Sequence, residues 1–228
     1  MKKLVLFLVV YVIFLEAQGQ LFTLGGVDIG YAYVGPKLGG SMAFMTNTNA
    51  NNDNVPLIGY MFGALGKFGI TQKLGIQVGV DYTKKGYAQS FSGGGDTKTI
   101  ANYLGIPILA KLSILKIGDL RFHGTGGVYS NVAISIKEKP SGSFDHEIIF
   151  TSSQTKRVDF GFNIGAGFEY DLGHGILALD LFYEQGLVDV FKDNVKLGRN
   201  TTQAFGLSVT YLYDLGNLLA FGDRKVQE

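Results

Sequence analysis

Apolar and polar residues alternate strictly along residues 158–171, VDFGFNIGAGFEYD. One set of alternate positions, from Val158 to Tyr170, is apolar or aromatic, and the other, from Asp159 to Asp171, is small, polar or acidic. Successive side chains of a β-strand point to opposite faces, so this stretch predicts a long strand with one apolar and one polar face. The apolar face has to meet either a protein core or lipid.

The same period of two recurs in seven other stretches, which predicts eight strands in all. The other expected strands cover about 34–45, 57–70, 74–85, 99–114, 120–136, 176–186 and 204–213. Pro107 lacks a backbone N–H, so we expect a bulge in the strand that contains it.

The connections between the expected strands alternate in length. Short turns follow the second, fourth and sixth strands, whereas longer polar segments such as 86–98 and 137–155 follow the odd-numbered ones. All short connections therefore fall at one end of the sheet. This up-and-down pattern is typical of outer-membrane barrels, which have short periplasmic turns and longer external loops.

Strand length and charge placement indicate that the apolar face meets lipid. The expected strands are long enough to cross about 25 Å of hydrocarbon when tilted, whereas strands of soluble proteins most often have about 5–6 residues. Aromatic residues such as Tyr82, Tyr170 and Tyr213 lie near strand ends, as in interfacial girdles. We therefore expect an all-β, eight-stranded antiparallel transmembrane barrel of the size of OmpA and OmpX.

Charges occupy the opposite, inward-facing set of positions. They are Lys67, Asp81, Lys111, Arg121, Asp159, Glu169, Asp180 and Glu184. A barrel of eight strands is just wide enough for side chains to fill its interior, and a buried charge is tolerated when it is paired. We expect these residues to form a closed lumenal charge network. A polar conduit with titratable gates is the alternative interpretation.

The N-terminus has the pattern of a secretory signal peptide. Two lysines precede the apolar run Leu4–Leu15, and Ala17 and Gly19 place small residues before Gln20. We expect a signal peptide at 1–19, a periplasmic lead-in at 20–33, the barrel at 34–214 and a C-terminal tail at 215–228. The expected location is the bacterial outer membrane, with outer-membrane lipids as partners.

Composition and motifs favour no catalytic chemistry. Lys and Arg total 20 against 19 Asp and Glu, which does not suggest nucleic-acid binding, and no Cys is present. His123, His146 and His174 lie far apart, so we expect no metal site, no cofactor and no enzyme. The pair Asp145 and His146, in a predicted loop, leaves rim-located catalysis as the least favoured alternative.

Three segments resemble a known family. GIQVGVDYTKKG, NYLGIPILAKL and DFGFNIGAGFEYDLGHGILALDLFYEQGL are similar to successive signatures of the Bacteroidetes outer-membrane β-barrel family, called PorT-like or porin family proteins. The resemblance covers about 34–214. It implies a small outer-membrane barrel, and one namesake of the family is implicated in type IX secretion and gliding.

These observations favour a structural or interaction role over transport. We expect a small closed barrel that meets a protein partner through its external loops or its outer wall, as an accessory to secretion or envelope assembly. A narrow channel for small solutes or ions is the second hypothesis, because the inward set is polar.

Overall fold

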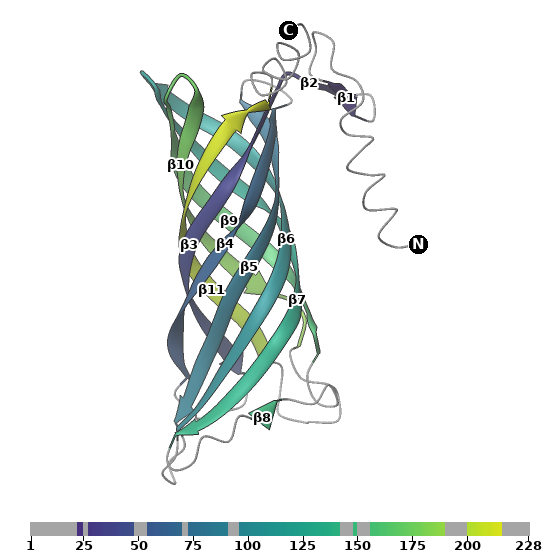
Figure 1. Ribbon diagram of the computed structural model, residues 1–228, viewed down its shortest axis with the longest axis vertical. Coiled ribbons are helices and arrows are strands. Elements are labelled where there is room, and N and C mark those ends of the chain that lie inside the picture. The colour runs from purple at the N-terminus through teal and green to yellow at the C-terminus, as the bar shows by residue number, and fades with distance from the viewer. Residues whose placement is uncertain are drawn as a thin grey trace, which may run out of the picture.

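The computed structural model describes residues 22–24, 27–47, 54–69, 73–90, 96–141, 148–149, 156–189 and 200–215. Eight long antiparallel strands form a sheet that closes on itself into a barrel (Figure 1). They are β3 (Tyr31–Asn47), β4 (Asn54–Gly69), β5 (Leu74–Ser90), β6 (Asp96–Ile117), β7 (Leu120–Ser141), β9 (Val158–Asp171), β10 (Gly175–Gly186) and β11 (Asn200–Asp214). The expected eight-stranded up-and-down barrel is confirmed.

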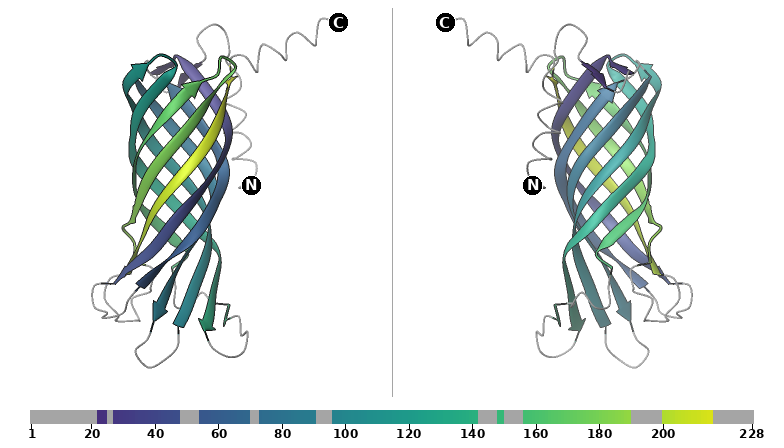
Figure 2. Two further views of the ribbon diagram at one scale, coloured as in Figure 1. Left: turned by 90° about the vertical axis from the view of Figure 1, so that its left-hand side faces the viewer. Right: turned by 90° about the vertical axis from the view of Figure 1, so that its right-hand side faces the viewer.

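The barrel closes where its first and last strands meet. β3 pairs with β11 along most of its length, and every other barrel strand pairs with the strands before and after it. Closure leaves none of the eight strands with an unpaired edge. Figure 2 shows the resulting cylinder from two sides, with β5, β6 and β7 extending furthest at the end that carries the longer connections.

Three short strands lie outside the barrel wall. β1 (Phe22–Leu24) and β2 (Val27–Ile29) form a separate antiparallel pair, and β8 (Ile148–Ile149) pairs with β7. The first pair falls within the expected lead-in of 20–33. The first barrel strand, β3, begins at Tyr31, which pairs with Gly69 of β4.

Two expected loops are shorter than predicted. β5 continues to Ser90 and β6 begins at Asp96, although 86–98 was expected to be a loop, and β7 continues to Ser141. These extensions are polar and lack the apolar alternation. The strands stay paired through these extensions by backbone hydrogen bonds. Hydrophobic periodicity cannot detect a polar strand segment of this kind.

The predicted bulge at Pro107 is wrong. Pro107 stands opposite Tyr129 of β7 without a shift of register, and the ladder with β5 omits Ile106 and Pro107 and resumes in the same register. The register shifts of β6 against β7 lie at 102–103 and at 113–115 instead. A proline lacks only the donor on one side of its strand, so the ladder can omit one bond and continue.

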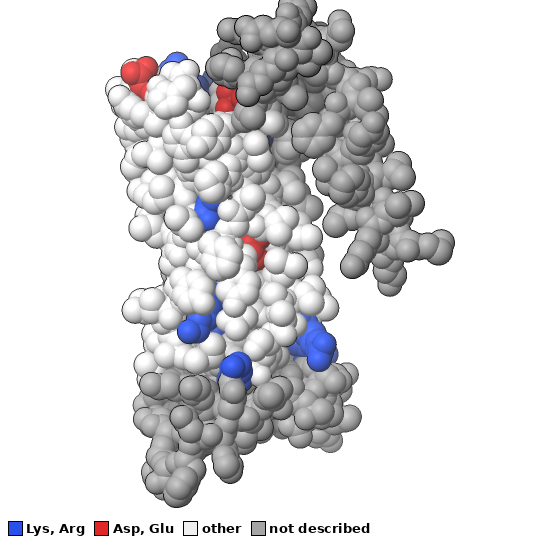
Figure 3. All heavy atoms as spheres, viewed as in Figure 1, with Lys and Arg blue, Asp and Glu red and all other residues white. Residues whose placement is uncertain are grey.

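The apolar set of side chains faces outward around the whole barrel. In β9, Val158 and Ile164 are each 52% exposed, whereas Asn163 is 5% and Glu169 2% exposed. The visible side wall shows little charge between its two ends (Figure 3). Among the described residues, no helix is both long and apolar enough to span a membrane.

Candidate functional site

All eight predicted lumenal charges lie on the inner face of the barrel. Six are buried, and Arg121 and Asp180 are partly buried. They come from β4, β5, β6, β7, β9 and β10, because the alternation of each strand turns its polar set inward. The structure places them in three groups along the lumen, rather than in the single network expected from the sequence.

The first group lies toward the end with the short turns, and its cations surround the carboxylate of Glu169. Lys67 Nζ donates to both carboxylate oxygens at 2.8 Å, and Lys111 Nζ lies 2.7 Å from Oε2. The side chains of Lys67, Lys111 and Glu169 are 0%, 1% and 2% exposed. Arg121 Nη1 is 3.9 Å from Oε2, too far for a hydrogen bond. One carboxylate thus balances two fully buried lysines.

Aromatic and apolar side chains surround this first group. Lys67 Nζ lies 5.5 Å from the ring centroids of both Tyr31 and Tyr33, a cation–π arrangement. Leu65, Ile176 and Leu212 form a buried apolar cluster against which Tyr33 packs. Side chains from seven strands, β3, β4, β6, β7, β9, β10 and β11, meet in this part of the lumen.

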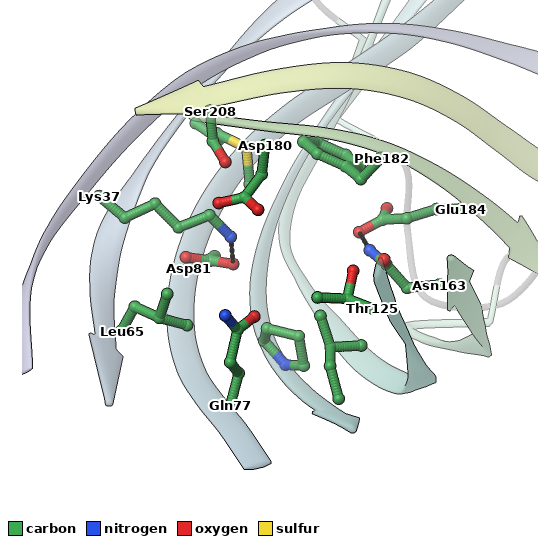
Figure 4. Close-up of a pocket in the computed structure, with 13 residues that line it drawn as sticks. Lys37, Leu65, Gln77, Asp81, Thr125, Asn163, Asp180, Phe182, Glu184 and Ser208 are labelled. Atoms are coloured by element: carbon green, nitrogen blue, oxygen red, sulfur yellow. Dashed lines mark hydrogen bonds and ion pairs between the residues drawn. The ribbon is translucent and has the colours of Figure 1, made fainter. Parts of the chain in front are cut away.

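The second group lies in the middle of the barrel. Lys37 Nζ is 2.8 Å from Asp81 Oδ2, and His123 Nε2 is 2.6 Å from Asp180 Oδ1. Figure 4 shows Lys37 and Asp81 pointing toward each other, with Asp180 and Phe182 beside them. A cavity of about 30 Å³ lies among these side chains. That is room for about two water molecules.

The third group lies toward the end with the longer connections. Lys85 pairs with Glu184, whose other oxygen accepts a 3.3 Å hydrogen bond from Asn163. Asp159 Oδ2 accepts a 2.9 Å bond from the Thr202 hydroxyl and a 3.4 Å bond from the Tyr129 hydroxyl. Both oxygens of Glu184 are therefore paired, whereas the buried Oδ1 of Asp159 has no hydrogen-bond partner.

Sequence reasoning missed the basic partners of the second and third groups. Lys37 shares the alternation of its inward neighbours, and that signal was visible in the sequence. Lys85 belongs to the same set of alternate positions as Asp81, but it was expected to lie at the end of its strand. His123 is two residues from Arg121 and shares its face of the strand, but its contact with Asp180 could not be read from a separation of 57 positions.

The interior charges balance in number but not in position. The three groups hold five cations, Lys37, Lys67, Lys85, Lys111 and Arg121, and five carboxylates, Asp81, Asp159, Glu169, Asp180 and Glu184. Three of the cations share Glu169 in the first group, whereas four carboxylates belong to the other two groups. The short-turn end of the interior therefore carries an excess of positive charge.

No metal centre forms within the part of the chain that the structure describes. No three His, Cys, Asp or Glu side chains come together there as metal ligands. His123 is buried beside Asp180, and His174 is exposed. The pair Asp145 and His146 lies outside the described residues, so its proposed catalytic role stays a prediction.

The comparison with protein families decides the class of this barrel. A family model described as an outer membrane protein beta-barrel domain matches residues 17–192. The chain belongs to this family. The protein is accordingly a barrel of the bacterial outer membrane, and its exposed apolar wall contacts membrane lipids. Its short turns face the periplasm and its longer connections face the outside.

The chain is similar to three solved bacterial proteins at low sequence identity. OprG from Pseudomonas aeruginosa is 11% identical with a TM-score of 0.48, over 81% of this chain and 95% of OprG. Ail from Yersinia pestis is 13% identical with a TM-score of 0.40, over 80% and 99% of the two chains. Neisserial surface protein A is 13% identical with a TM-score of 0.44, over 79% and 96%. No curated protein sequence matches this chain.

Proposed function

We propose that the protein is a closed outer-membrane barrel with a structural and interaction role, rather than an enzyme or a diffusive pore. The observation that carries this proposal is the burial of Lys67, Lys111 and Glu169, at 0%, 1% and 2% exposure, across the lumen. Solutes need a continuous water-filled path, and at this level no water reaches the charged side chains. Separating these charges inside the lumen would leave buried charges without a partner, which disfavours opening at this level.

A closed barrel acts through the surfaces that it presents. Four longer connections, between β3 and β4, β5 and β6, β7 and β9, and β10 and β11, meet the outside, and the apolar wall meets lipid. We propose that a protein partner binds these connections or the wall. The resemblance to the PorT-like group of Bacteroidetes supports an accessory role in secretion or envelope assembly, after export with a cleaved signal peptide.

Planar-bilayer recording tests the closed lumen. The purified wild-type protein should give no stable conductance steps. Stable openings that change in size or ion selectivity in Asp81→Asn or Arg121→Gln variants would overturn the proposal, because they would place a conducting path beside those side chains.

Recovery of partners tests the interaction role. Affinity purification from native outer membrane should recover a protein that is lost when residues 48–53 or 142–147 are replaced by Gly-Ser segments of equal length. The same replacement at the periplasmic turn 172–174 is the matched control. A barrel that is recovered alone, from a strain whose deletion mutant secretes normally, would eliminate the secretion role.

The cavity in the second group supports a narrow channel as the second candidate. It has room for about two water molecules next to Lys37, Asp81 and Asp180, in the middle of the lumen. This candidate requires the Lys67–Glu169–Lys111 group to open. Small, discrete conductances that increase in a Glu169→Gln variant would favour it.

A further inference from the structure

A cavity of about 460 Å³ opens at the periplasmic mouth of the barrel, next to the first interior group, with which it shares Arg121. It is lined by Tyr31, Tyr33, Lys73, Ser113, Ile114, Leu115, Lys116 and Arg121. The charged residues among these described lining residues, Lys73, Lys116 and Arg121, are all cations. The cavity lies between the start of β3, the turn before β5 and the hairpin of β6 and β7.

The register shift in β6 places two of these cations side by side. Leu112 and Ile114, at the end of the regular alternation, point outward with exposures of 54% and 70%. The shift at 113–115 breaks this alternation, so that Lys116 stands directly opposite Arg121, whose side chain points inward. Like charges directly opposite each other in a ladder are destabilising. Bulges that re-aim a side chain in this way are concentrated next to functional sites.

The interior behind the cavity adds to the positive potential. Lys67 and Lys111 already use both oxygens of Glu169, and Arg121 lies 3.9 Å from that carboxylate. The first group therefore has three cations for one carboxylate. Asp119, Asp171 and Asp214 also lie at this end of the barrel, but none of them lines the cavity. Among the described residues, the lining therefore includes no carboxylate.

We propose that this cavity binds an anionic phosphate or carboxylate group that reaches it from the periplasm. The planar guanidinium of Arg121 suits bidentate contact with either group, and Lys116 stands next to it as a second cation. The Ser113 hydroxyl is a further donor in the lining, and the rings of Tyr31 and Tyr33 offer surface to the rest of the ligand. The volume is within the range of small-molecule sites, about 300–1,000 Å³.

The site does not depend on the closed lumen. A phosphate group can come from a soluble periplasmic compound or from the headgroup of a phospholipid in the inner leaflet, and both offer the same chemistry to Arg121 and Lys116. A conducting barrel would leave this proposal standing, and failure to bind phosphate would leave the closed barrel standing.

Thermal unfolding in the presence of inorganic phosphate tests the site. The melting temperature of the full-length protein in non-ionic detergent, followed by circular dichroism, should rise with phosphate at constant ionic strength and then saturate. Ligand that binds only the folded state stabilises it in this way. The variant Arg121→Gln/Lys116→Gln should need at least tenfold more phosphate for the same rise. Because this variant loses a repulsive pair, it should melt no lower than the wild type without phosphate.

Two further variants make the result decisive. Lys84→Gln/Arg157→Gln removes two cations at the opposite end of the barrel and should keep the wild-type response. Lys116→Gln alone, at an exposed position, replaces the double variant if the latter does not fold, and should weaken the response several-fold. In phosphate-free nanodiscs, a shift with phosphatidylglycerol over phosphatidylcholine that needs Arg121 and Lys116 would identify the headgroup as the source. A wild type that responds to neither probe, or a control variant that loses the response equally, would overturn the proposal.

Discussion

Lys67 and Glu169 are 102 positions apart in the chain, yet the lysine nitrogen lies 2.8 Å from both carboxylate oxygens inside the barrel. The two residues come from β4 and β9, which are not neighbours in the sheet. Their side chains therefore cross the lumen and join opposite walls. Lys111 adds a third strand to the same carboxylate.

Loss of the carboxylate at this position should be costly. Glu169→Gln leaves two buried ammonium groups without a counter-charge, which should lower the free energy of unfolding by about 3–5 kcal/mol. Reversible denaturant unfolding in lipid vesicles measures this loss. Asp171→Asn, two residues further along β9 at an exposed position, should change the free energy by less than about 0.5 kcal/mol.

A double variant tests whether Lys67 and Glu169 stabilise the barrel as a pair. Lys67→Met on the Glu169→Gln background should recover part of the lost stability, because it removes one uncompensated charge from the interior. Full additivity of the two single changes would show that the pair does not interact, and would contradict the structure.

The closing seam between β3 and β11 should be intolerant of a side chain at Gly35. A Cβ there would clash with the backbone oxygen of Tyr211, so Gly35→Ala has to push the two strands apart. We expect a loss of about 1–3 kcal/mol, or a failure to assemble. The readout is heat-modifiable migration in electrophoresis together with unfolding in vesicles.

Gly126→Ala is the matched control for this seam. A Cβ at Gly126 meets no atom within 4 Å, so the variant should be as stable as the wild type or slightly more stable. Equal losses at Gly35 and Gly126 would mean that the close approach of β3 and β11 is not what restricts Gly35.

A charge on the outer wall should cost more near the middle of a strand than near its end. Ile164 lies at the middle of β9 and Val158 at its start, and both are 52% exposed. Ile164→Arg should cost about 2–4 kcal/mol in a bilayer, and Val158→Arg about 0–1 kcal/mol. Unfolding in vesicles gives both values, and equal costs would contradict the assignment of this face to lipid.

The sequence predicted most where a local pattern carries the information. The alternation along β9 correctly placed Ile164 on the outer face and Asn163 and Glu169 on the inner face, because side chains of a strand alternate with a period of two residues. This alternation shows which face of the sheet a residue occupies, but not which residue it contacts. Glu184 was therefore predicted to face the lumen, whereas its pairing with Lys85, 99 positions away, was not.

Features that depend on pairing between strands could not be predicted from the sequence. The bulge at 113–115 turns Lys116 to stand opposite Arg121, yet nothing in that segment distinguishes it from a regular strand. Pro107 was the visible signal for a bulge and did not produce one. Tyr31 was assigned to the lead-in. Its place in the barrel depends on backbone pairing with β4 and on the contact of its ring with Lys67, and neither can be read from the local sequence.

The most direct measurement uses the absence of Cys from this chain, which allows single cysteines to be introduced without background. Spin labels placed one at a time along 158–171 in lipid vesicles report collisions with oxygen, which concentrates in lipid, and with a water-soluble nickel chelate. We predict high oxygen access at Phe160, Phe162 and Ile164, and low access to both reagents at Asp159, Asn163 and Glu169. Strong nickel-chelate access at those three inward positions would show an open aqueous lumen, and reversed parity would show that the apolar face does not meet lipid.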